Sequence, residues 1–377
     1  MSELNYLEKL LDGTEVEWKA LGDVTSVLRG KRLTKNLLSA EEKFPVFHGG
    51  LEPLGYYNKS NRPANTVMII NVGASAGTVG YSTVDFWSSD GCFCLEHNEL
   101  LNNRFLYFAL IGYQSLLKSK VRVAGIPTLD AIVVNKLLIP IPCPENPEKS
   151  LAIQSEIVRI LDKFTALTAE LTAELNMRKK QYNYYRDQLL SFKEGEVEWK
   201  TLGEVAQFKR GTAITQKQTT PGEIPVVANG PIPTYFHSES NRQGETIVIA
   251  RSGAYAGYVS FWDQPIFLTD AFSVHSDLKI VKPKFIYHVL QNKQEHIHAM
   301  KKGAGVPHVR VKEFETYDIP IPPITEQDRI VSILDKFDTL TNSITEGLPR
   351  EIELRQKQYE YYRDLLFSFP KPETVSN

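Results

Sequence analysis

Basic side chains give this sequence its most regular chemical pattern, because they return at matching places in two halves of the chain. Those early in each half are Arg29, Lys31, Arg32, Lys209 and Arg210. Those late in each half are Lys118, Lys120, Arg122, Lys301, Lys302, His308 and Arg310. Cations on glycine-containing loops of a rigid globule are suited to contacts with phosphate oxygens. A charge cluster is usually only a solvated surface, but this recurrence makes the residues candidate ligands of a nucleic-acid backbone.

Two further groups of residues accompany the cations. The pair Asn61 and Arg62 returns as Asn241 and Arg242. GASAG at 73–77 returns as GAYAG at 253–257, and the residues on or beside these glycines are Ser75, Tyr255 and Arg251. The glycine segments resemble phosphate-binding loops only loosely and are more typical of tight turns at strand ends. We therefore treat them as turns and their polar neighbours as weaker candidates for contact with nucleic acid.

No catalytic residue and no metal site is predicted. The sequence contains neither G-x-x-x-x-G-K-[ST] nor G-x-S-x-G. Two E-x-K segments, at 17–19 and 198–200, have the form seen in some nucleases, but an upstream acidic partner is missing, so a packing role is the better interpretation. The histidines of EHIH at 295–298 would point to different sides of a helix. Cys92 and Cys94 have no second pair and are better explained as buried thiols.

Composition limits the class of protein. The 377 residues are 42% hydrophobic and 23% charged, as in ordinary folded domains. The net charge of −2 does not exclude nucleic-acid binding, because local patches set the electrostatic field. Three cysteines without C-x-x-C spacing fit a reducing compartment. With no signal peptide and no apolar run long enough to span a membrane, we expect a cytoplasmic protein without a membrane partner.

The sequence contains a tandem repeat. EVEWKALGDV at 15–24 returns as EVEWKTLGEV at 196–205, and QYNYYRDQLLSF at 181–192 returns as QYEYYRDLLFSF at 358–369. The ends of the two halves match closely, while their middles match only at scattered points. One scaffold that carries two different inserts explains this pattern better than even drift after a duplication.

Each middle is predicted to be a mixed α/β globule. Short β-branched runs that end at glycine, at 66–73 and 246–253, indicate buried strands. The segments 103–120 and 285–302 have the spacing of amphipathic helices.

A long helix is predicted after each globule, because 151–192 contains no Gly or Pro and its apolar residues recur at steps of three and four. The seam residues are Leu161, Phe164, Leu171, Leu175, Tyr182 and Tyr185 in the first helix and Leu334, Phe337, Tyr359 and Tyr362 in the second. The two seams are expected to pack against each other as an antiparallel coiled coil. An insertion at 349–352, which begins with Pro349, is expected to kink the second helix.

The arrangement of these parts resembles the specificity (HsdS) subunits of Type I restriction–modification systems. The likeness lies in order and spacing: a variable domain, an IPIP exit, a helix start Q-x-x-I-V-x-I-L-D-K-F at 154–164 and 327–337, a helix end near QYxYYRDxLLSF, and then all of it again. It implies target-recognition domains at 15–150 and 196–323 and spacer helices at 151–195 and 324–377. An N-terminal helical segment, 1–14, would complete the repeat and lie close to the C-terminus. The expected fold class is α/β, of the mixed α+β kind, with an internal pseudo-two-fold repeat.

The resemblance also implies a function. The chain would be a non-catalytic subunit that reads a split, asymmetric DNA target with two domains held at fixed spacing. Its partners would be double-stranded DNA, two methyltransferase (modification) subunits and the restriction (motor and nuclease) subunits. S-adenosylmethionine and ATP with Mg²⁺ would bind to those partners, and no cofactor would bind to this chain. Two alternatives stay open: the DNA-recognition part of a self-contained restriction–methylation enzyme, and a two-headed protein-interaction scaffold.

The first long helix contains a letter-for-letter tetrapeptide repeat, TAELTAEL at 168–175. One extra copy would lengthen a helix by about 6 Å and turn it by about 40° net. One base pair of DNA rises by ~3.4 Å and turns by ~34°. The copy number is therefore predicted to set the gap between two half-sites, in steps of about one base pair. A slipped but functionally silent helix repeat is the alternative.

Overall fold

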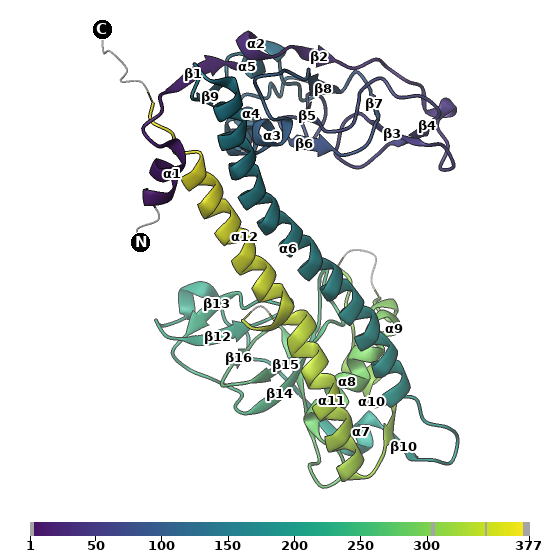
Figure 1. Cartoon of the computed structure of the whole chain (residues 1–377). Helices are drawn as coiled ribbons and strands as arrows, with labels where there is room; N and C mark the ends of the chain where they lie inside the picture. The colour runs from purple at the N-terminus through teal and green to yellow at the C-terminus, as the bar shows by residue number, and fades with distance from the viewer. Residues whose placement is uncertain (1–3, 303–305, 344, 372–377) are drawn as a thin grey trace. The chain divides into compact units, whose positions relative to one another are not determined.

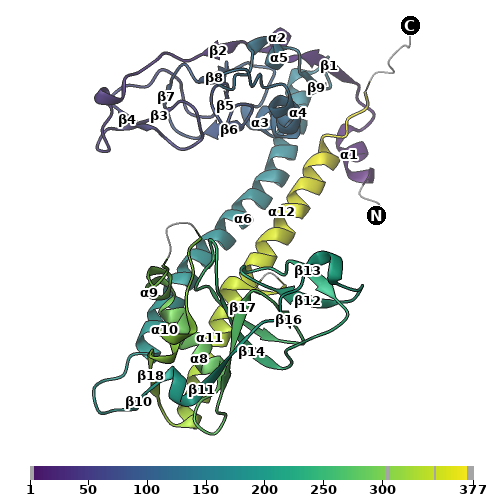
Figure 2. The same cartoon turned by 180° about the vertical axis from the view of Figure 1, so that it is seen from behind.

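The computed structural model describes residues 4–302, 306–343 and 345–371. It forms two compact units, which Figure 1 shows from one side and Figure 2 from behind. Unit 1 comprises residues 1–170 and 352–377, and unit 2 comprises residues 171–351. Unit 1 is thus built from two distant parts of the chain, whereas unit 2 is one continuous segment. Residues 1–3 and 372–377 of the predicted outer segments lie outside the described residues.

Unit 1 contains a four-stranded antiparallel sheet in the order β2-β8-β5-β6, a three-stranded sheet β4-β3-β7 and the pair β1-β9. Its strands are β1 (Val16–Ala20), β2 (Val27–Arg29), β3 (Phe44–Phe47), β4 (Gly55–Tyr57), β5 (Thr66–Ile70), β6 (Val79–Ser82), β7 (Trp87–Ser88), β8 (Cys92–Leu95) and β9 (Leu138–Pro142). Its short helices are α1 (Leu4–Leu11), α2 (Leu21–Val24), η1 (Lys35–Leu37), α3 (Asn103–Gly112), α4 (Gln114–Ser119) and α5 (Ala131–Asn135).

Unit 2 repeats this topology, with the sheet orders β11-β17-β14-β15, β13-β12-β16 and β10-β18. Its strands are β10 (Glu198–Thr201), β11 (Ala206–Arg210), β12 (Ile224–Val227), β13 (Tyr235–His237), β14 (Glu245–Ala250), β15 (Val259–Asp263), β16 (Phe267–Leu268), β17 (Ala271–Ser276) and β18 (Asp318–Ile321). Its short helices are α7 (Leu202–Val205), η2 (Gln216–Gln218), α8 (Pro283–Asn292), α9 (Gln294–Ala299) and α10 (Val311–Glu315). The prediction of a repeated, mixed α/β fold is confirmed.

The strands predicted from the β-branched runs are buried on both faces. In β5, Val67 and Ile69 belong to the core that contains helix α3, while Met68 and Ile70 belong to a second core with Cys92 and Cys94. Successive side chains of a strand point to opposite faces, so a strand between two cores needs an unbroken apolar run. Both cysteines are buried free thiols, as predicted.

The repeated sequences at the two ends of each globule form one structural element. Strand β1 pairs antiparallel with β9, so that Trp18 lies opposite Pro140, and β10 pairs with β18 in the same way. Within the E-x-K segments, the half-buried Lys19 lies 3.1 Å from Glu17 and the half-buried Lys200 lies 3.2 Å from Glu198. The EVEWK and IPIP segments therefore close each globule, in agreement with a packing role.

The helices predicted at 103–120 and 285–302 are each broken in two, contrary to expectation. The breaks come at Tyr113, between α3 and α4, and at Lys293, between α8 and α9. Directly after each break a glutamine side chain accepts a hydrogen bond from a strand: Gln114 from Val79 N at 2.9 Å and Gln294 from Val259 N at 3.0 Å. A continuous helix would direct these glutamines elsewhere and leave the strand amides unpaired.

The spacer helices differ from each other in continuity. Helix α6 (Pro147–Leu189) is unbroken, while the second spacer is formed by α11 (Ile324–Asn342) and α12 (Gly347–Leu366). The kink predicted at Pro349 is therefore wrong in position, because Pro349 lies in the first turn of α12, where no backbone N–H is needed. The chain turns at Gly347 instead, with φ of 80°, and an added Cβ there would lie 2.3 Å from Thr339 O.

The tail of each repeat packs beside the start of the other repeat's helix. In unit 1 the rings of Phe164 and Tyr362 stack at 5.2 Å. In unit 2 the ring of Phe337 stacks against Tyr182 at 6.1 Å and against Tyr185 at 5.6 Å.

The predicted seam is only partly a helix–helix contact. Leu161 and Tyr359 are buried in the core of unit 1, and Leu334 in the core of unit 2, so these side chains hold the helices to the globules. Leu171 and Leu175 are half-buried, and 45% of Tyr185 is exposed.

A buried glutamine at the start of each spacer helix fixes the globule to it. Gln154 accepts a hydrogen bond from Asn102 N at 2.8 Å and donates one to Leu100 O at 3.0 Å. Gln327 does the same with Lys282 N at 2.9 Å and Ile280 O at 3.0 Å. These contacts explain why the glutamine recurs in the Q-x-x-I-V-x-I-L-D-K-F segments: it satisfies backbone groups next to helices α3 and α8.

Candidate nucleic-acid interface

Two loops that are distant in sequence meet in each unit and bring the predicted residues together. In unit 1, Gly73 N donates to Pro127 O at 2.9 Å, and Leu129 N donates to Asn71 O at 2.8 Å. In unit 2, Gly253 N donates to Pro307 O at 2.9 Å, and Val309 N donates to Arg251 O at 3.0 Å. The glycine turn and the basic loop therefore form one surface in both units.

The glycines of these turns serve close packing. Gly77 and Gly257 have φ of 85° and 82°, which favours glycine. An added Cβ at Gly77 would lie 2.8 Å from the backbone nitrogen of Lys118, and at Gly257 it would lie 3.0 Å from Ile297. The interpretation as tight turns at strand ends is confirmed. Ser75 is half-buried on its turn, while 50% of Tyr255 is exposed.

A basic pocket lies on this surface in unit 2. Its volume is about 330 Å³, and five basic side chains line it: Arg210, Arg251, His308, Arg310 and Lys312. Four of them were predicted from sequence, and they come from β11, from the end of β14 and from the loop before α10. A concave surface lined by one sign of charge focuses the potential and attracts anions.

Arg251 is held in place by a polar cluster. Its Nη1 lies 3.2 Å from Asp270, whose other carboxylate oxygen accepts hydrogen bonds from Asn229 Nδ2 at 2.6 Å and Ser252 Oγ at 2.8 Å. Partial burial acts to raise the pKa of Asp270, but the hydrogen bonds from Asn229 and Ser252 and the charge of Arg251 outweigh it and hold the pKa below its usual value. The carboxylate is therefore ionised at neutral pH and fixes the guanidinium.

Unit 1 has different side chains at the same place. Asn71, which occupies the position of Arg251, is buried, and its Oδ1 has no hydrogen-bond partner in the described structure. The accessible polar group here is instead the half-buried His48, whose Nδ1 lies 3.4 Å from Asp90 and 3.3 Å from Ser89 Oγ. The common scaffold thus presents two different sets of hydrogen-bonding groups.

The recurrence of the Asn–Arg pair has a structural explanation. Asn61 donates to Ser88 O at 3.0 Å and accepts from Ser88 N at 2.7 Å, and Asn241 makes the same two bonds with Leu268. Arg242 donates to Arg210 O at 2.8 Å and to Ser273 Oγ at 2.7 Å, and burial lowers its pKa.

Arg62 donates to Asn61 O at 2.8 Å and to Arg29 O at 3.3 Å. These side chains tie a loop to the sheet in each unit. Their contact with nucleic acid stays a prediction.

The remaining predicted cations lie on the surface. The exposed ones are Arg29, Lys31, Arg32, Lys118, Lys120 and Lys209. Three others also contact protein groups: Arg122 pairs with Asp130 at 2.8 Å, Lys302 with Glu313 at 2.7 Å, and Lys301 donates to Ala254 O at 3.0 Å. Exposed ion pairs contribute little to stability, so Arg122 can exchange Asp130 for phosphate.

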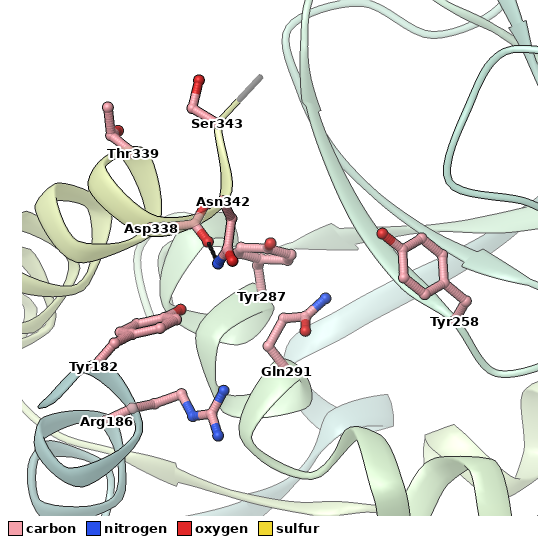
Figure 3. Close-up of a pocket in the computed structure, with 9 residues that line it drawn as sticks. All are labelled: Tyr182, Arg186, Tyr258, Tyr287, Gln291, Asp338, Thr339, Asn342 and Ser343. Carbon is pink, nitrogen blue, oxygen red and sulfur yellow. Dashed lines mark hydrogen bonds between the residues drawn. The ribbon is translucent and has the colours of Figure 1, made fainter. Parts of the chain in front are cut away.

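A polar pocket beside the spacer helices of unit 2 was not predicted from sequence (Figure 3). Its volume is about 700 Å³, and its lining includes Tyr182, Arg186, Tyr258, Tyr287 and Gln291. Burial raises the pKa of Tyr182 to about 12 and also raises that of Tyr287, so both phenols stay protonated at neutral pH. The YNYYR segment of α6 is the sequence feature that could have indicated this pocket, because it supplies Tyr182 and Arg186.

The described residues contain neither a metal-binding cluster nor a membrane-spanning helix. No group of three His, Cys, Asp or Glu side chains in the described ranges is placed to hold a metal ion. No helix among the same residues has the length and apolar character needed to cross a membrane.

Comparisons with known proteins agree with this organisation. The family described as Type I restriction modification DNA specificity domain matches residues 14–178 and 194–354. A Type I restriction enzyme specificity subunit of Escherichia coli is 45% identical over the whole of both chains, and the EcoprrI specificity subunit of the same species is 37% identical over 92% of this chain and 93% of its own.

A solved structure shares the fold. The S subunit of a Type I restriction–modification system from M. genitalium superposes with a TM-score of 0.72 at 22% identity, covering 96% of this chain and 98% of that one. The two family matches fall on the two halves that the sequence repeats, and both halves have the same strand order. The chain therefore belongs to the family of DNA specificity subunits of Type I restriction–modification systems.

Proposed function

We propose that this chain selects the DNA sequence on which a Type I restriction–modification complex acts. The basic pocket of unit 2 is the observation that carries this proposal, because five basic side chains line one concave surface on loops that recur in unit 1. Such a surface is suited to DNA phosphates, which position a protein on the duplex. Membership of the specificity-subunit family supplies the biological setting.

Each unit would read one half of a split target. The scaffolds share a strand order, but the accessible groups differ. Unit 2 has Arg251 where unit 1 has the buried Asn71, and unit 1 has His48 at the start of the loop that contains Asn229 in unit 2. Sequence is read by hydrogen bonds to base edges, so different side chains select different bases. The two half-sites should therefore differ, and a palindromic methylation target would contradict the proposal.

Lys118, Arg122, Lys301 and Arg310 are proposed to contact phosphates. Replacing any one of them by Ala should weaken binding to all DNA sequences and reduce the slope of affinity against salt by about one unit per contact. Lys336→Ala, on the exposed surface of α11, is the matched control and should leave both quantities unchanged. A variant that changed target preference while keeping its non-specific affinity would refute the phosphate assignment.

The spacer helices would hold the two recognition domains at fixed spacing as a coiled coil and bind the partner subunits. Two methyltransferase subunits and the restriction subunits are the partners that we propose, with S-adenosylmethionine, ATP and Mg²⁺ bound by them and catalysis left to them. Tyr184 in α6 and Tyr361 in α12 occupy equivalent places in the repeat, and 61% and 53% of these side chains are exposed. The surfaces around Tyr184 and Tyr361, which we call the aromatic surfaces, are equivalent in the repeat and therefore suit two copies of one partner.

This partner assignment predicts a change in stoichiometry. Tyr184→Ala and Tyr361→Ala should each weaken the binding of one modification subunit, so that native mass spectrometry of each variant detects complexes with a single such subunit. Leu354→Ala, an exposed apolar side chain on α12 outside the aromatic surfaces, is the control. Full occupancy by both tyrosine variants would show that these surfaces do not bind the subunit.

A further inference from the structure

Each unit carries an exposed apolar side chain directly before the proline of the loop that the basic residues flank, and the loop of unit 1 carries a second one, Val123, which is 78% exposed. Ile126 in unit 1 is 71% exposed, and Val306 in unit 2 is 65% exposed. Each stands directly before a proline, Pro127 or Pro307, whose carbonyl accepts the hydrogen bond from the neighbouring glycine turn. Single exposed apolar residues are common on proteins, but two at equivalent places in different recognition domains suggest a shared task.

The loop around Ile126 is held rigidly. Arg122 N donates to Thr128 O at 2.9 Å, and Thr128 N donates back to Arg122 O at 3.0 Å, which closes the base of the loop. Thr128 Oγ1 also donates to Ile126 O at 2.9 Å, and Gly125 has φ of 89°. In unit 2, Lys302 and His308 form the same reciprocal pair, with both distances 3.0 Å. Ile126 is therefore presented in a fixed place.

The charges beside these loops indicate an anionic partner. Lys118, Lys120 and Arg122 precede the loop of unit 1, and Asp130 is its only acidic residue between positions 118 and 130. In unit 2 the basic pocket is lined by residues that follow Val306 closely, from His308 to Lys312. An apolar tip between cations matches DNA, because phosphates flank an apolar stack of bases.

We propose that Ile126 and Val306 are wedges that enter a groove of the DNA and pack against the bases, partly unstacking one step in each half-site. The proposal rests on the DNA-recognition function above and adds apolar contact with the stacked bases to it. Apolar side chains that enter the minor groove commonly open base steps in this way, while adjacent cations hold the backbone on either side. No bond is made or broken, so the effect is one of fit and DNA shape.

The test uses the full chain assembled with its modification subunits and a duplex that carries the target defined by mapping methylated adenines. 2-Aminopurine replaces one adenine at a time, because its fluorescence rises when the base is unstacked. The adenine that becomes methylated is left unreplaced, since the modification subunit itself takes that base out of the stack. The wild-type complex should raise the fluorescence at one step in each half-site. Ile126→Ala should abolish the rise at one half-site only, and Val306→Ala at the other.

Affinity and salt dependence separate the wedge from a phosphate contact. Ile126→Ala should weaken specific binding about tenfold, the value expected for a few lost apolar carbons, and should leave the salt slope unchanged. Ile132→Ala is the matched control, since Ile132 is 60% exposed on α5 of the same unit but lies outside the loop. That variant should behave as the wild type does in both measurements.

Three outcomes decide the matter. Unchanged fluorescence and affinity in Ile126→Ala, with wild-type specificity intact, would overturn the wedge and leave the recognition function standing. Loss of the modification subunit from Ile126→Ala, with normal DNA fluorescence, would overturn it and identify the loop as a protein contact. A wild-type complex that does not distinguish its methylation target from random duplex would instead contradict the proposed function itself.

Discussion

Asp335 on α11 accepts a hydrogen bond from Nε2 of the fully buried His288 on α8, at 2.8 Å. Its other carboxylate oxygen lies 2.9 Å from Lys284 Nζ. Unit 1 attaches its globule to α6 with a different set of side chains. Arg104 pairs with Asp162 at 2.8 Å, and the Arg104 guanidinium lies over the ring of Phe108. Phe108 occupies the position that His288 has in unit 2. The two globules are therefore fixed to their spacer helices by a common salt bridge with different neighbours.

The Asp335 contact predicts acid sensitivity of unit 2. Burial acts to raise the pKa of Asp335, but hydrogen bonds from His288 and Lys284, with their charges, lower it below the usual value. The stabilisation should therefore be present above about pH 4, the unfolded pKa of aspartate, and be lost as the pH falls through the lower folded pKa. Below pH 4 the melting temperature of the wild type should fall more steeply than that of Asp335→Asn. Asp263→Asn, an exposed strand residue, should keep the wild-type slope, and equal slopes for all three proteins would count against the contact.

Leu161→Asp should unfold the junction between α6 and the first globule. The side chain is fully buried in the unit 1 core, so an unpaired carboxylate there should cost on the order of 3–5 kcal/mol of unfolding free energy. Leu167→Asp is the control, because Leu167 lies on the same helix and is 37% exposed. Chemical denaturation measures the difference, and assembly with the modification subunit should fail for Leu161→Asp. Normal assembly by that variant would show that this part of α6 does not support the complex.

Arg251 is expected to read a base in the half-site of unit 2. An arginine held by an ionised carboxylate presents its remaining N–H groups in a fixed direction, and guanine O6 and N7 are its commonest specific partners. Arg251→Ala should relax preference at one position by about 1–3 kcal/mol and leave the other half-site unchanged. Asp270→Asn, which loosens Arg251 without removing it, should relax the same position less.

Methylation mapping of cells that carry each Arg251 or Asp270 variant gives the recognised sequences directly. Lys209→Ala is the comparison. Lys209 is an exposed cation on β11 that should contact phosphate, so its loss should weaken binding to every DNA sequence. If Arg251→Ala also weakened binding to all DNA sequences equally, Arg251 would be a phosphate ligand.

The TAEL repeat is expected to set the gap between the half-sites. Helix α6 runs unbroken through residues 168–175, and the division between the two units falls inside the repeat, after Glu170. Removing or adding one copy should shift the spacer of the methylated sequence by about one base pair while keeping both half-sites. If variants with one and three copies kept the parental spacer, the repeat would be a silent feature of the helix.

Much of the fold could be predicted from sequence because its signals are local or repeated. The buried strands β5 and β14 follow from apolar runs, and the tandem repeat required two similar globules. The breaks at Tyr113 and Lys293 could not be found, since they depend on Gln114 and Gln294 meeting strand amides that are distant in sequence. The end of α11 at Asn342 was not predicted, because Pro349 is the stronger local signal for a helix break. In the structure Pro349 lies in the first turn of α12, where a proline does not disrupt a helix.

The candidate site could be predicted in part. Arg210, Arg251, His308 and Arg310 line one pocket. The recurrence of basic clusters had singled out Arg210, His308 and Arg310, and Arg251 was a candidate because it lies beside a glycine turn. Recurrence alone cannot distinguish a ligand contact from a structural one, however. Asn61 and Asn241 recur because each binds both backbone groups of a distant strand residue, and Gln154 and Gln327 recur for a similar reason. Hydrogen-bond partners at such separations have no signature in a single sequence.

The division of unit 1 between two distant parts of the chain has a consequence for its synthesis. Tyr359, Leu366 and Phe369 are buried in the same core as Phe105, so the globule that leaves the ribosome first lacks part of its interior until residues 359–369 have been synthesised. Unit 2, which is continuous, can close earlier. Domains generally fold in the order in which they are made, but here the second recognition domain should be complete before the first. Until then the nascent first domain exposes an apolar surface that chaperones can bind.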